Sequence, residues 1–433
     1  MSGGPRWDRR RLLRTGAAAV GGAGVGWSTS AVVTNTAHAA GLDAAGRAGD
    51  GVVRVGPSAG AETVALGGRH QPGVDTPTQA HASLLGWDLL PGSDTPHLIR
   101  LMRLLTDDAR RLGNGRPALA DTEPELAAHP SRLTVTFGFG PRVLRELAPG
   151  VGGGEATAPI GRRPLEDLPR FARDELKEPW GQTDVIAQVA CDDPLTLAHA
   201  RRVLTKDARP LARLRWIQSG FRNARGTAPG STMRNLMGQV DGTANPDPAL
   251  PDFDPLVWID DGPLAGGTCL VLRRIRMHLD SWDKVDRLGR EATIGRRLDT
   301  GAPLTGTGEF DPVDLQATDK FGLPVIDPAS HVARARSTDP TERFLRRGFN
   351  YTDPDPTRPD GEDSGLLFVA FAADPQRQFV PVQRRLHELD RLNAWITTIG
   401  SAVYAVPPAA REDDPRDYVG STLLEPGATR SGA

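Results

Sequence analysis

The sequence has only two cysteines, almost no net charge and no long hydrophobic run. Cys191 and Cys269 are too few for a disulfide framework, and without a CxxC pair they give no support to a thiolate metal site. Both stand in apolar stretches, so we expect buried small hydrophobic side chains, with oxidation to one disulfide as the alternative. The formal charge of -2, from 52 basic and 54 acidic residues, provides no basic field for nucleic acid.

Lysine is scarce, and glycine and proline are not abundant enough to indicate disorder. Only four of the 52 basic residues are lysine, a skew that we interpret as coding bias. The 49 glycines and 37 prolines make about a fifth of the chain, below the roughly 25–30% typical of low-complexity segments. The 433 residues allow about two to four domains and a sizeable core.

Common nucleotide-binding and hydrolase motifs are also missing. No GxxxxGK[ST] phosphate loop occurs. Gly138-Phe139-Gly140 follows a strand-like segment, but the third glycine of a dinucleotide fingerprint is replaced by Val143. The sequence has no HExxH pair, and its one GxSxG match, GPSAG at 56–60, stands in a weakly patterned stretch that we expect to be a linker. No motif of these kinds therefore supports a nucleotide-dependent or hydrolytic function.

The first forty residues have the three parts of an export leader. A basic stretch at 8–14, with the sequence DRRRLLR, precedes a weakly apolar run at 15–27 and then Ala37-His38-Ala39. This order is typical of a signal peptide, and the arginines followed by leucines resemble the twin-arginine export signal. The apolar run is too short and too rich in Gly and Ala for a stable membrane span. We expect residues 1–39 to direct export to the periplasm or the cell exterior, with a basic tail as the alternative.

After residue 76 the chain alternates strand-like and helix-like segments. Residues 40–76 have only a weak pattern, so we expect a linker there. β-Branched and aromatic segments predict strands at 81–90, 133–140, 184–190, 214–221, 267–277 and 365–371. Helical spacing predicts helices at 96–112, 195–204, 281–288, 291–297 and 379–392, and the segment 165–176, interrupted by Pro169, should be a loop. This order predicts an α+β fold with two related halves that join near 225–250.

Three segments of the second half contain the residues of greatest chemical interest. The first, GQVDGTANP at 238–246, has Asp241 before a glycine, which taken alone is a tight turn with an aspartate cap. The second, DPASHVARAR at 327–336, places His331 on a loop among arginines. The third, RFLRRGFNY at 343–351, contains Arg346 and Arg347. Taken singly, a surface histidine and a solvated pair of arginines are the simpler interpretations.

Together, the three segments resemble the dye-decolorizing peroxidase family, and most of all its twin-arginine-exported subgroup linked to haem and iron handling. The resemblance runs from HQPG at 70–73 through WIQSGF at 216–221, RNLMG at 234–238, RRIRM at 273–277 and GAPL at 301–304 to Pro407. It implies haem b as the cofactor. It also implies two ferredoxin-like domains of the dimeric α+β barrel type, at 77–235 and 236–410, followed by a tail at 411–433.

The resemblance implies roles for individual residues. His331 is implied as the ligand of the haem iron, because a neutral imidazole can bind iron through one nitrogen while the other donates a tuning hydrogen bond. Asp241 and Arg346 are implied as the catalytic pair on the open face. There a carboxylate can shuttle a peroxide proton, and a guanidinium can stabilise charge on the leaving oxygen. Arg347 is a rival of Arg346, which is preferred because it directly follows the aliphatic Leu345.

Further residues are implied around the haem. Gly242, Thr243 and Ala244 have small side chains that would let the backbone approach the porphyrin, and Asn245 would be a partner behind the site. Arg336 is the candidate counter-charge for a haem propionate. The Asn-Pro-Arg that usually follows the family's histidine is replaced here by Arg-Ser-Thr.

The resulting prediction is a secreted haem peroxidase that reduces hydrogen peroxide and oxidises phenolic or dye-like donors in one-electron steps. The alternative is a haem-binding protein that releases iron in an uptake system, which the same fold and residues would serve. We expect no nucleic-acid partner and no stable membrane span, and self-association is left open. Donors too large for the cavity would need a surface relay. The candidates, each also explained by ordinary core packing, are Trp216, Trp258, Trp282, Trp395, Tyr351 and Tyr404.

Overall fold

The computed structural model describes residues 59–148, 160, 163, 165–227 and 230–426. The leader that we predict at 1–39 lies outside the described residues, as does the first part of the predicted linker. All described residues belong to a single unit, Pro57–Ala433.

Within these residues the chain forms nine strands and nine α-helices, joined by short 3₁₀ turns. The strands are β1 His81–Leu89, β2 Thr134–Phe139, β3 Val185–Cys191, β4 Ala212–Phe221, β5 Thr268–Met277, β6 Leu345–Arg346, β7 Phe349–Pro354, β8 Glu362–Ala372 and β9 Ile396–Val406. The helices are α1 Thr95–Gly113, α2 Pro141–Glu146, α3 Pro194–Ala208, α4 Phe253–Val257, α5 Leu279–Trp282, α6 Arg287–Ile294, α7 His331–Ala335, α8 Phe379–Leu389 and α9 Ser421–Leu424. All six predicted strands are present, and 165–176 is a loop as predicted.

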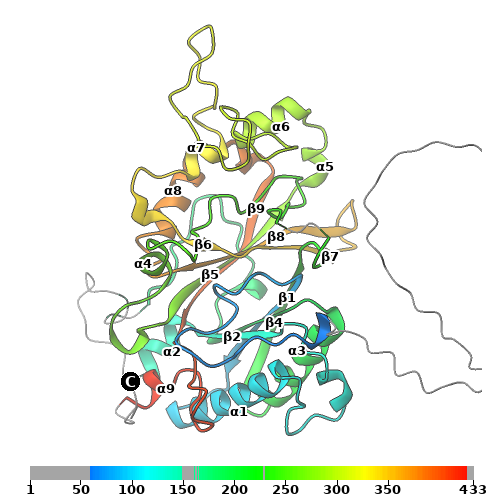
Figure 1. The fold of residues 1–433 in the computed structure, drawn as a ribbon, viewed down its shortest axis with the longest axis vertical. Coiled ribbons are helices and arrows are strands. Elements are labelled where there is room, and N and C mark those ends of the chain that lie inside the picture. The colour runs from blue at the N-terminus through cyan, green and yellow to red at the C-terminus, as the bar shows by residue number, and fades with distance from the viewer. Residues whose placement is uncertain (1–58, 149–159, 161–162, 164, 228–229, 427–433) are drawn as a thin grey trace, which may run out of the picture. The chain divides into compact units, whose positions relative to one another are not determined.

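The strands form one antiparallel barrel, which confirms the predicted α+β class. In the N-terminal half the strand order is β4-β1-β3-β2, and in the C-terminal half the corresponding order is β9-β5-β8-β7. Two narrow contacts join the halves: Phe139 of β2 pairs with Ala405 of β9, and Phe221 of β4 pairs with Asn350 of β7. The short β6 pairs with β8 along the same edge as β7, opposite the edge that pairs with β5. Strands of both halves are needed to close the barrel, so neither half forms a closed barrel by itself (Figure 1).

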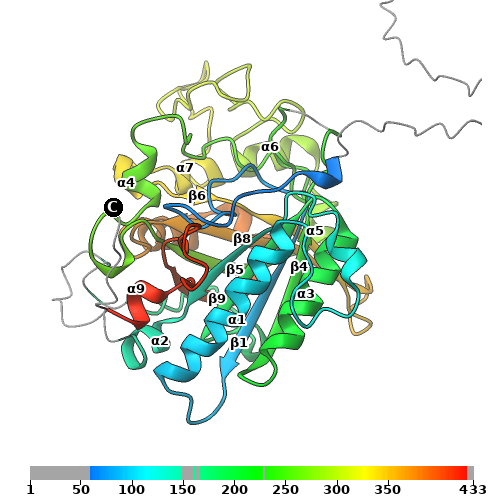
Figure 2. The ribbon, with the colours of Figure 1, turned by 60° about the horizontal axis from the view of Figure 1, so that its bottom comes forward.

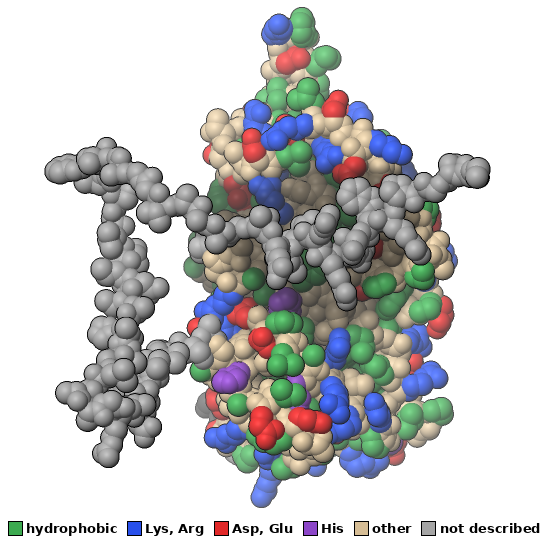
Figure 3. Space-filling model, turned by 90° about the vertical axis from the view of Figure 1, so that its right-hand side faces the viewer, with side chains coloured by type: hydrophobic (Ala, Val, Ile, Leu, Met, Phe, Trp, Pro, Cys, Tyr) green, Lys and Arg blue, Asp and Glu red, His purple; other side chains and the backbone are tan. Residues whose placement is uncertain are grey.

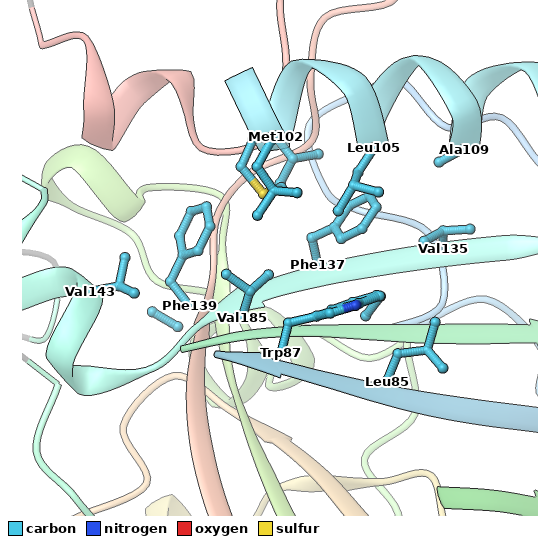
Figure 4. Close-up of a cluster of buried hydrophobic side chains, with 14 of the residues drawn as sticks. Leu85, Trp87, Met102, Leu105, Ala109, Val135, Phe137, Phe139, Val143 and Val185 are labelled. Atoms are coloured by element: carbon cyan, nitrogen blue, oxygen red, sulfur yellow. The ribbon is translucent and has the colours of Figure 1, made fainter. Parts of the chain in front are cut away.

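The N-terminal half is closed by α1 and α3, which lie side by side over its sheet (Figure 2). Asp94 starts α1 by accepting a hydrogen bond from the His97 amide at 2.9 Å. Met102 and Leu105 on the apolar side of α1 face Phe137 of the sheet (Figure 4). Each such leucine, fully buried, stabilises the fold by about 1.5–3 kcal/mol. The interior of this half is therefore filled by hydrophobic side chains.

Two predicted helices of the C-terminal half differ from the structure. Residues 281–288 are not one helix, because α5 ends at Trp282 and a new helix, α6, begins at Arg287. Asp286 caps α6 by accepting a hydrogen bond from the Gly289 amide at 2.7 Å. Helix α6 ends at Ile294, earlier than predicted, because Gly295 adopts a left-handed φ of 88°.

The end of the chain also differs from the prediction. Helix α8 stops at Leu389 and not at Leu392, because the Asp390 carboxylate accepts a hydrogen bond from the Leu392 amide at 2.9 Å and starts a 3₁₀ turn. Strand β9 follows and was not predicted, although Ile396–Val406 is rich in β-branched residues. It pairs with β5 over ten residues and completes the sheet of the C-terminal half.

Both cysteines are buried and free, as predicted. In the part of the chain that the structure describes, no helix combines the length and the apolar character that a bilayer crossing requires. In Figure 1, α5, α6, α7 and α8 gather on the opposite side from α1 and α3. The candidate site lies among these helices.

Candidate active site

The C-terminal half encloses a cavity of about 570 Å³. Its walls come from the loop at 235–244, from β5, β6, β8 and β9, and from α7 and α8. Apolar side chains form much of the lining: Ile275, Met277, Leu366, Phe368, Phe379, Val382, Leu386 and Ile396. The face drawn in Figure 3 is hollowed at its middle, and charged side chains of both signs are scattered around the hollow. A cavity with apolar walls and a few polar groups is typical of a site for an organic ligand or cofactor.

Asp241 lies on a loop that folds back on itself. Its amide donates a hydrogen bond to the Met233 carbonyl at 2.8 Å. Gly238 and Gly242 have φ angles of 81° and 134°, which residues with a side chain rarely adopt. The Asp-Gly turn recognised in the sequence therefore sets the path of the backbone on which the aspartate stands.

Asp241 and Arg346 form an ion pair in the cavity wall. The Nη1 atom of Arg346 lies 3.3 Å from Oδ1 of Asp241, and the second carboxylate oxygen accepts a hydrogen bond from Asn235 at 3.4 Å. The two side chains are 26% and 24% exposed, so both charges are accessible from the cavity. Arg346 belongs to β6 and pairs with Ala370 of β8. The structure thus brings together the two residues predicted as the catalytic pair.

Asn245 ties the Asp241 loop to β6. Its side-chain amide donates to the Arg346 carbonyl at 2.8 Å, and its side-chain oxygen accepts from the Arg346 amide at 3.1 Å. These reciprocal bonds hold the backbone of Arg346 next to the loop that carries Asp241. Asn245 therefore occupies the supporting position that the sequence suggested.

Arg347, the rival of Arg346, is directed away from this cavity. Its guanidinium donates to the side-chain oxygen of Gln79 at 2.5 Å and to the Thr78 hydroxyl at 3.2 Å, and it also bonds the Thr76 carbonyl. It is 2% exposed, and burial lowers its pKa to about 9. Consecutive residues of a strand point to opposite faces, which explains why Arg346 reaches the cavity and Arg347 does not.

His331 is the first residue of α7 and does not lie on a loop, contrary to the prediction. Ser330 caps this helix by accepting a hydrogen bond from the Ala333 amide at 3.4 Å. The Nδ1 atom of His331 lies 2.6 Å from Oδ2 of Asp390, whose side chain is 1% exposed. Because Asp390 engages Nδ1, Nε2 is the nitrogen that can bind a metal.

The charges around the cavity act on His331. Burial would lower the pKa of His331, but the charge and the hydrogen bond of Asp390 outweigh burial and raise that pKa above its ordinary value. Asp241 raises it further, whereas Arg346 lowers it. His331 and the Asp241–Arg346 pair therefore share one electrostatic environment, although they come from separate elements.

The remaining predicted residues also line the cavity. Gly242, Thr243 and Ala244 form one part of the wall, and the Thr243 hydroxyl donates a hydrogen bond to Glu309 at 2.9 Å. Arg336 ends α7 and its side chain is exposed at the cavity edge. The structure thus gathers every predicted site residue around one cavity.

Two residues of the site were not predicted, Asp390 and Arg296. Arg296 lines the cavity and donates through Nη1 to the carbonyls of Gly301 at 2.6 Å and Glu309 at 2.8 Å. Burial lowers the pKa of Arg296, the charge of Glu309 opposes this effect, and Arg346 adds to it. No local motif marks either residue, because each joins the site through contacts distant in sequence.

Among the described residues, no group of three or more His, Cys, Asp or Glu side chains could hold a bare metal ion. A metal at His331 would therefore need further ligands from an organic group, as in a metalloporphyrin. Of the six predicted relay residues, five are buried, namely Trp216, Trp258, Trp282, Tyr351 and Tyr404. Trp395 is only partly buried, and its ring lies 5.2 Å from that of Trp282.

The chain is similar to known proteins over most of its length. The family described as Dyp-type peroxidase, C-terminal, matches residues 232–411, and its N-terminal counterpart matches residues 71–222. A dye-decolorizing peroxidase of Thermobifida fusca is 39% identical over 380 residues, which are 82% of this chain and 84% of the relative. A deferrochelatase of Escherichia coli is 30% identical over 387 residues, which are 85% of this chain and 89% of the relative.

Two solved structures are also similar to the chain. The DyP-type peroxidase of Cellulomonas bogoriensis is 49% identical, with a TM-score of 0.78, and the match covers 85% of this chain and 99% of that one. Ferric DtpA of Streptomyces lividans is 39% identical, with a TM-score of 0.78, and the match covers 86% of this chain and 100% of that one.

Proposed function

The chain belongs to the Dyp-type peroxidase family, and we propose that its cavity holds haem b between His331 and the Asp241–Arg346 pair. One observation carries the assignment of residues. A single cavity is lined both by an imidazole whose Nδ1 is bound to a buried aspartate and by an aspartate–arginine ion pair. The reaction is the reduction of hydrogen peroxide coupled to one-electron oxidation of a donor.

The residues around the cavity fit haem. The apolar walls suit the faces of a porphyrin, and Nε2 of His331 suits its iron. Arg296 and Arg336 provide two cations for two propionates. When bound, haem supplies an iron centre that accepts oxidising equivalents from peroxide and passes them on one electron at a time.

Asp241 and Arg346 act on the peroxide. The Asp241 carboxylate takes the proton from one peroxide oxygen and returns it to the other, so that water can leave. The Arg346 guanidinium, 3.3 Å away, stabilises the negative charge on the leaving oxygen. Asn235 and Asn245 hold the two groups in place from behind.

His331 and Asp390 act on the haem iron and not on the peroxide. The hydrogen bond from Nδ1 to the Asp390 carboxylate fixes the ring orientation and increases the electron density at Nε2. Asp390 is itself held by the Leu392 amide at 2.9 Å. A more basic imidazole is a stronger iron ligand and favours cleavage of the oxygen–oxygen bond.

Haem reconstitution tests this function directly. The purified protein mixed with haem should acquire a Soret absorbance band and then oxidise a phenolic donor only when hydrogen peroxide is present. A protein without a Soret band after reconstitution would contradict the proposal.

Iron release from haem is the second candidate function, because a deferrochelatase is 30% identical over 85% of the chain. The same residues would hold haem for this reaction. Recovery of iron with an intact porphyrin, and no peroxide-dependent turnover of a dye, would favour it. The 39% identity to a dye-decolorizing peroxidase supports the peroxidase as the first candidate.

Three finer features complete the proposal. The two halves are ferredoxin-like repeats. Their strand orders, β4-β1-β3-β2 and β9-β5-β8-β7 when read in the same direction, support this proposal. The protein is exported by the twin-arginine pathway, which the basic, apolar and small-residue order of residues 8–39 supports. The donors are phenolic or dye-like compounds.

Large donors deliver electrons through Trp395. It is the one of the six relay candidates that reaches the surface, and its ring lies 5.2 Å from the buried ring of Trp282. The indole of Trp282 donates a hydrogen bond to the Met237 carbonyl at 3.1 Å, and Met237 lines the cavity. The pair therefore connects the cavity wall with the protein surface.

A further inference from the structure

Two threonines on either side of Asp241 donate hydrogen bonds to one carboxylate oxygen. The hydroxyl of Thr232 lies 2.5 Å from Oε1 of Glu309, and the hydroxyl of Thr243 lies 2.9 Å from the same atom. Thr232 precedes Asp241 in the loop and Thr243 follows it. Glu309 belongs to a separate segment of the chain, and its carboxylate therefore holds the two sides of the Asp241 loop together.

Glu309 is itself held in place by Arg296. The Arg296 guanidinium donates through one nitrogen to the carbonyls of Gly301 and Glu309, at 2.6 and 2.8 Å. Next to Glu309, the Asp311 carboxylate closes a turn by accepting a hydrogen bond from the Gly308 amide at 2.9 Å. The segment 301–311 thus presents the Glu309 carboxylate from a supported backbone.

The Asp241 loop needs such an external support. Gly238 and Gly242 both have positive φ, so the loop contains two residues with little intrinsic stiffness. A Cβ at Gly242 would lie 3.2 Å from Cγ2 of Thr232, so the two sides of the loop already pack closely. The Asp241–Arg346 distance of 3.3 Å is at the long end for a hydrogen bond, and a small shift of the loop would break it.

We propose that Glu309 is a positioning residue that, through Thr232 and Thr243, fixes Asp241 against Arg346. The proposal rests on the function proposed above, in which these two residues act on peroxide. Glu309 touches neither substrate nor cofactor in this role. Its effect is confined to the position of the loop. A displacement of a reacting group by about one ångström is enough to slow a reaction by about a hundredfold.

The test uses four variants of the haem-loaded protein. Glu309→Ala removes the acceptor, Glu309→Gln keeps an oxygen that can accept from both hydroxyls, and Thr243→Val removes one donor at constant shape. Asp314→Asn is the matched control, because Asp314 lies just beyond this segment and its exposed carboxylate accepts a hydrogen bond from the Gln316 amide at 2.9 Å.

Three quantities separate positioning from simple destabilisation. They are the dissociation constant of fluoride from the ferric protein, the second-order rate constant with hydrogen peroxide, and the urea unfolding of the apoprotein. Fluoride binding at equilibrium reports the hydrogen bonds that the Asp241–Arg346 side of the cavity makes to an iron-bound anion, and it needs no turnover. We expect Glu309→Ala to weaken fluoride binding and slow the peroxide step by about tenfold or more. Thr243→Val should have a smaller effect, while Glu309→Gln and Asp314→Asn should stay near the parent. The step in which the donor is oxidised should not change in any of them.

Parent-like fluoride affinity and peroxide rate in both Glu309→Ala and Thr243→Val would overturn the proposal. If Glu309→Ala does not fold, parent-like Thr243→Val alone overturns it, because that substitution keeps the carboxylate and the shape. A parent protein that binds no haem, or does not react with peroxide, refutes the proposed function instead. The two failures are therefore distinguishable.

Discussion

The two halves of the barrel have corresponding strand orders but use their helices differently. In the N-terminal half, α1 and α3 pack on the sheet, and Leu98, Leu101, Met102 and Leu105 of α1 are at most 1% exposed. In the C-terminal half, the helices and loops leave a cavity of about 570 Å³ over the sheet. The first half is therefore built for stability, and the second gives up part of its packing to make room for a cofactor.

A histidine–aspartate pair in each half makes the comparison sharper. In the N-terminal half, Nε2 of His199 lies 2.9 Å from Asp121, and the side chains are 2% and 0% exposed. In the C-terminal half, Nδ1 of His331 lies 2.6 Å from Asp390, but the His331 side chain is 34% exposed. The same pair is a closed structural contact in one half and leaves an accessible, oriented imidazole in the other.

The largest effect is expected from His331→Ala compared with His199→Ala. His331→Ala should abolish the Soret band and lower the unfolding free energy of the apoprotein by about 1–3 kcal/mol, because it leaves the buried Asp390 without its partner. His199→Ala should retain haem but lower the unfolding free energy by about 1–3 kcal/mol, since it leaves the buried Asp121 without its partner. Absorbance and urea unfolding measure the two quantities. Equal haem loss in both variants would remove the distinction between the halves.

The next effect concerns the ion pair in the cavity. Asp241→Asn and Arg346→Leu should each retain haem and slow the reaction with peroxide by about a hundredfold or more, because the proton carrier or the stabilising charge is lost. Stopped-flow absorbance gives the rate constants. Arg213→Leu, an exposed change on β4 of the N-terminal half, is the control and should react like the parent. Unchanged rates in both cavity variants would disprove the assignment of Asp241 and Arg346 as the residues that act on peroxide.

A smaller effect is expected from Asp108 of α1, a titratable residue buried in the N-terminal half. Burial, and then the neighbouring Asp207 and Asp107, raise the pKa of Asp108 to about 7. The folded state therefore retains a proton that the unfolded state loses near pH 4, and stability falls as the pH rises from about 4 to about 7. Asp108→Asn removes this titration, so it should stabilise the protein by about 2 kcal/mol at pH 8 and have little effect at pH 4.

Urea unfolding at the two pH values measures the effect of Asp108. Glu146→Gln is the matched control, because Glu146 of α2 is 54% exposed and pairs with Arg142 on the surface. The control should show no pH-dependent gain. A parent-like pH dependence in Asp108→Asn would show that this half contains no buried titrating carboxyl.

The smallest effect is expected from Trp395→Phe. Turnover of a bulky dye should fall several-fold, because the surface end of the Trp282–Trp395 pair is lost, while turnover of a small phenol should stay unchanged. Steady-state kinetics with the two donors measure the difference. Trp258→Phe, at a stacked contact with His70 away from the cavity, is the control. An equal loss with both donors would indicate a general defect in the site.

The parts of this architecture that depend on local pattern could be predicted from the sequence. Strands such as 133–140 and helices such as 96–112 follow from apolar spacing, and the DG turn marked Asp241. The choice of Arg346 over Arg347 came from the family resemblance, because Arg346 directly follows the aliphatic Leu345.

Other features depended on contacts that no local pattern reveals. Asp390 reaches His331 across 59 positions of sequence, and Arg296 reaches the cavity only through the fold of segment 301–309. The start of α6 and the ends of α6 and α8 were set by single capping aspartates or a left-handed glycine, which compete with the apolar spacing. The distant partners of the site therefore required the structure.

Chemical rescue of His331→Gly tests the central claim most directly. The substitution should abolish the Soret band of the haem-loaded protein, and added imidazole should restore both the band and the reaction with hydrogen peroxide, because free imidazole can occupy the vacated position. Restoration by imidazole would establish His331 as the iron ligand of a peroxidase site in the C-terminal half. A variant with the parent spectrum before imidazole is added, or one that imidazole does not restore, would contradict the account.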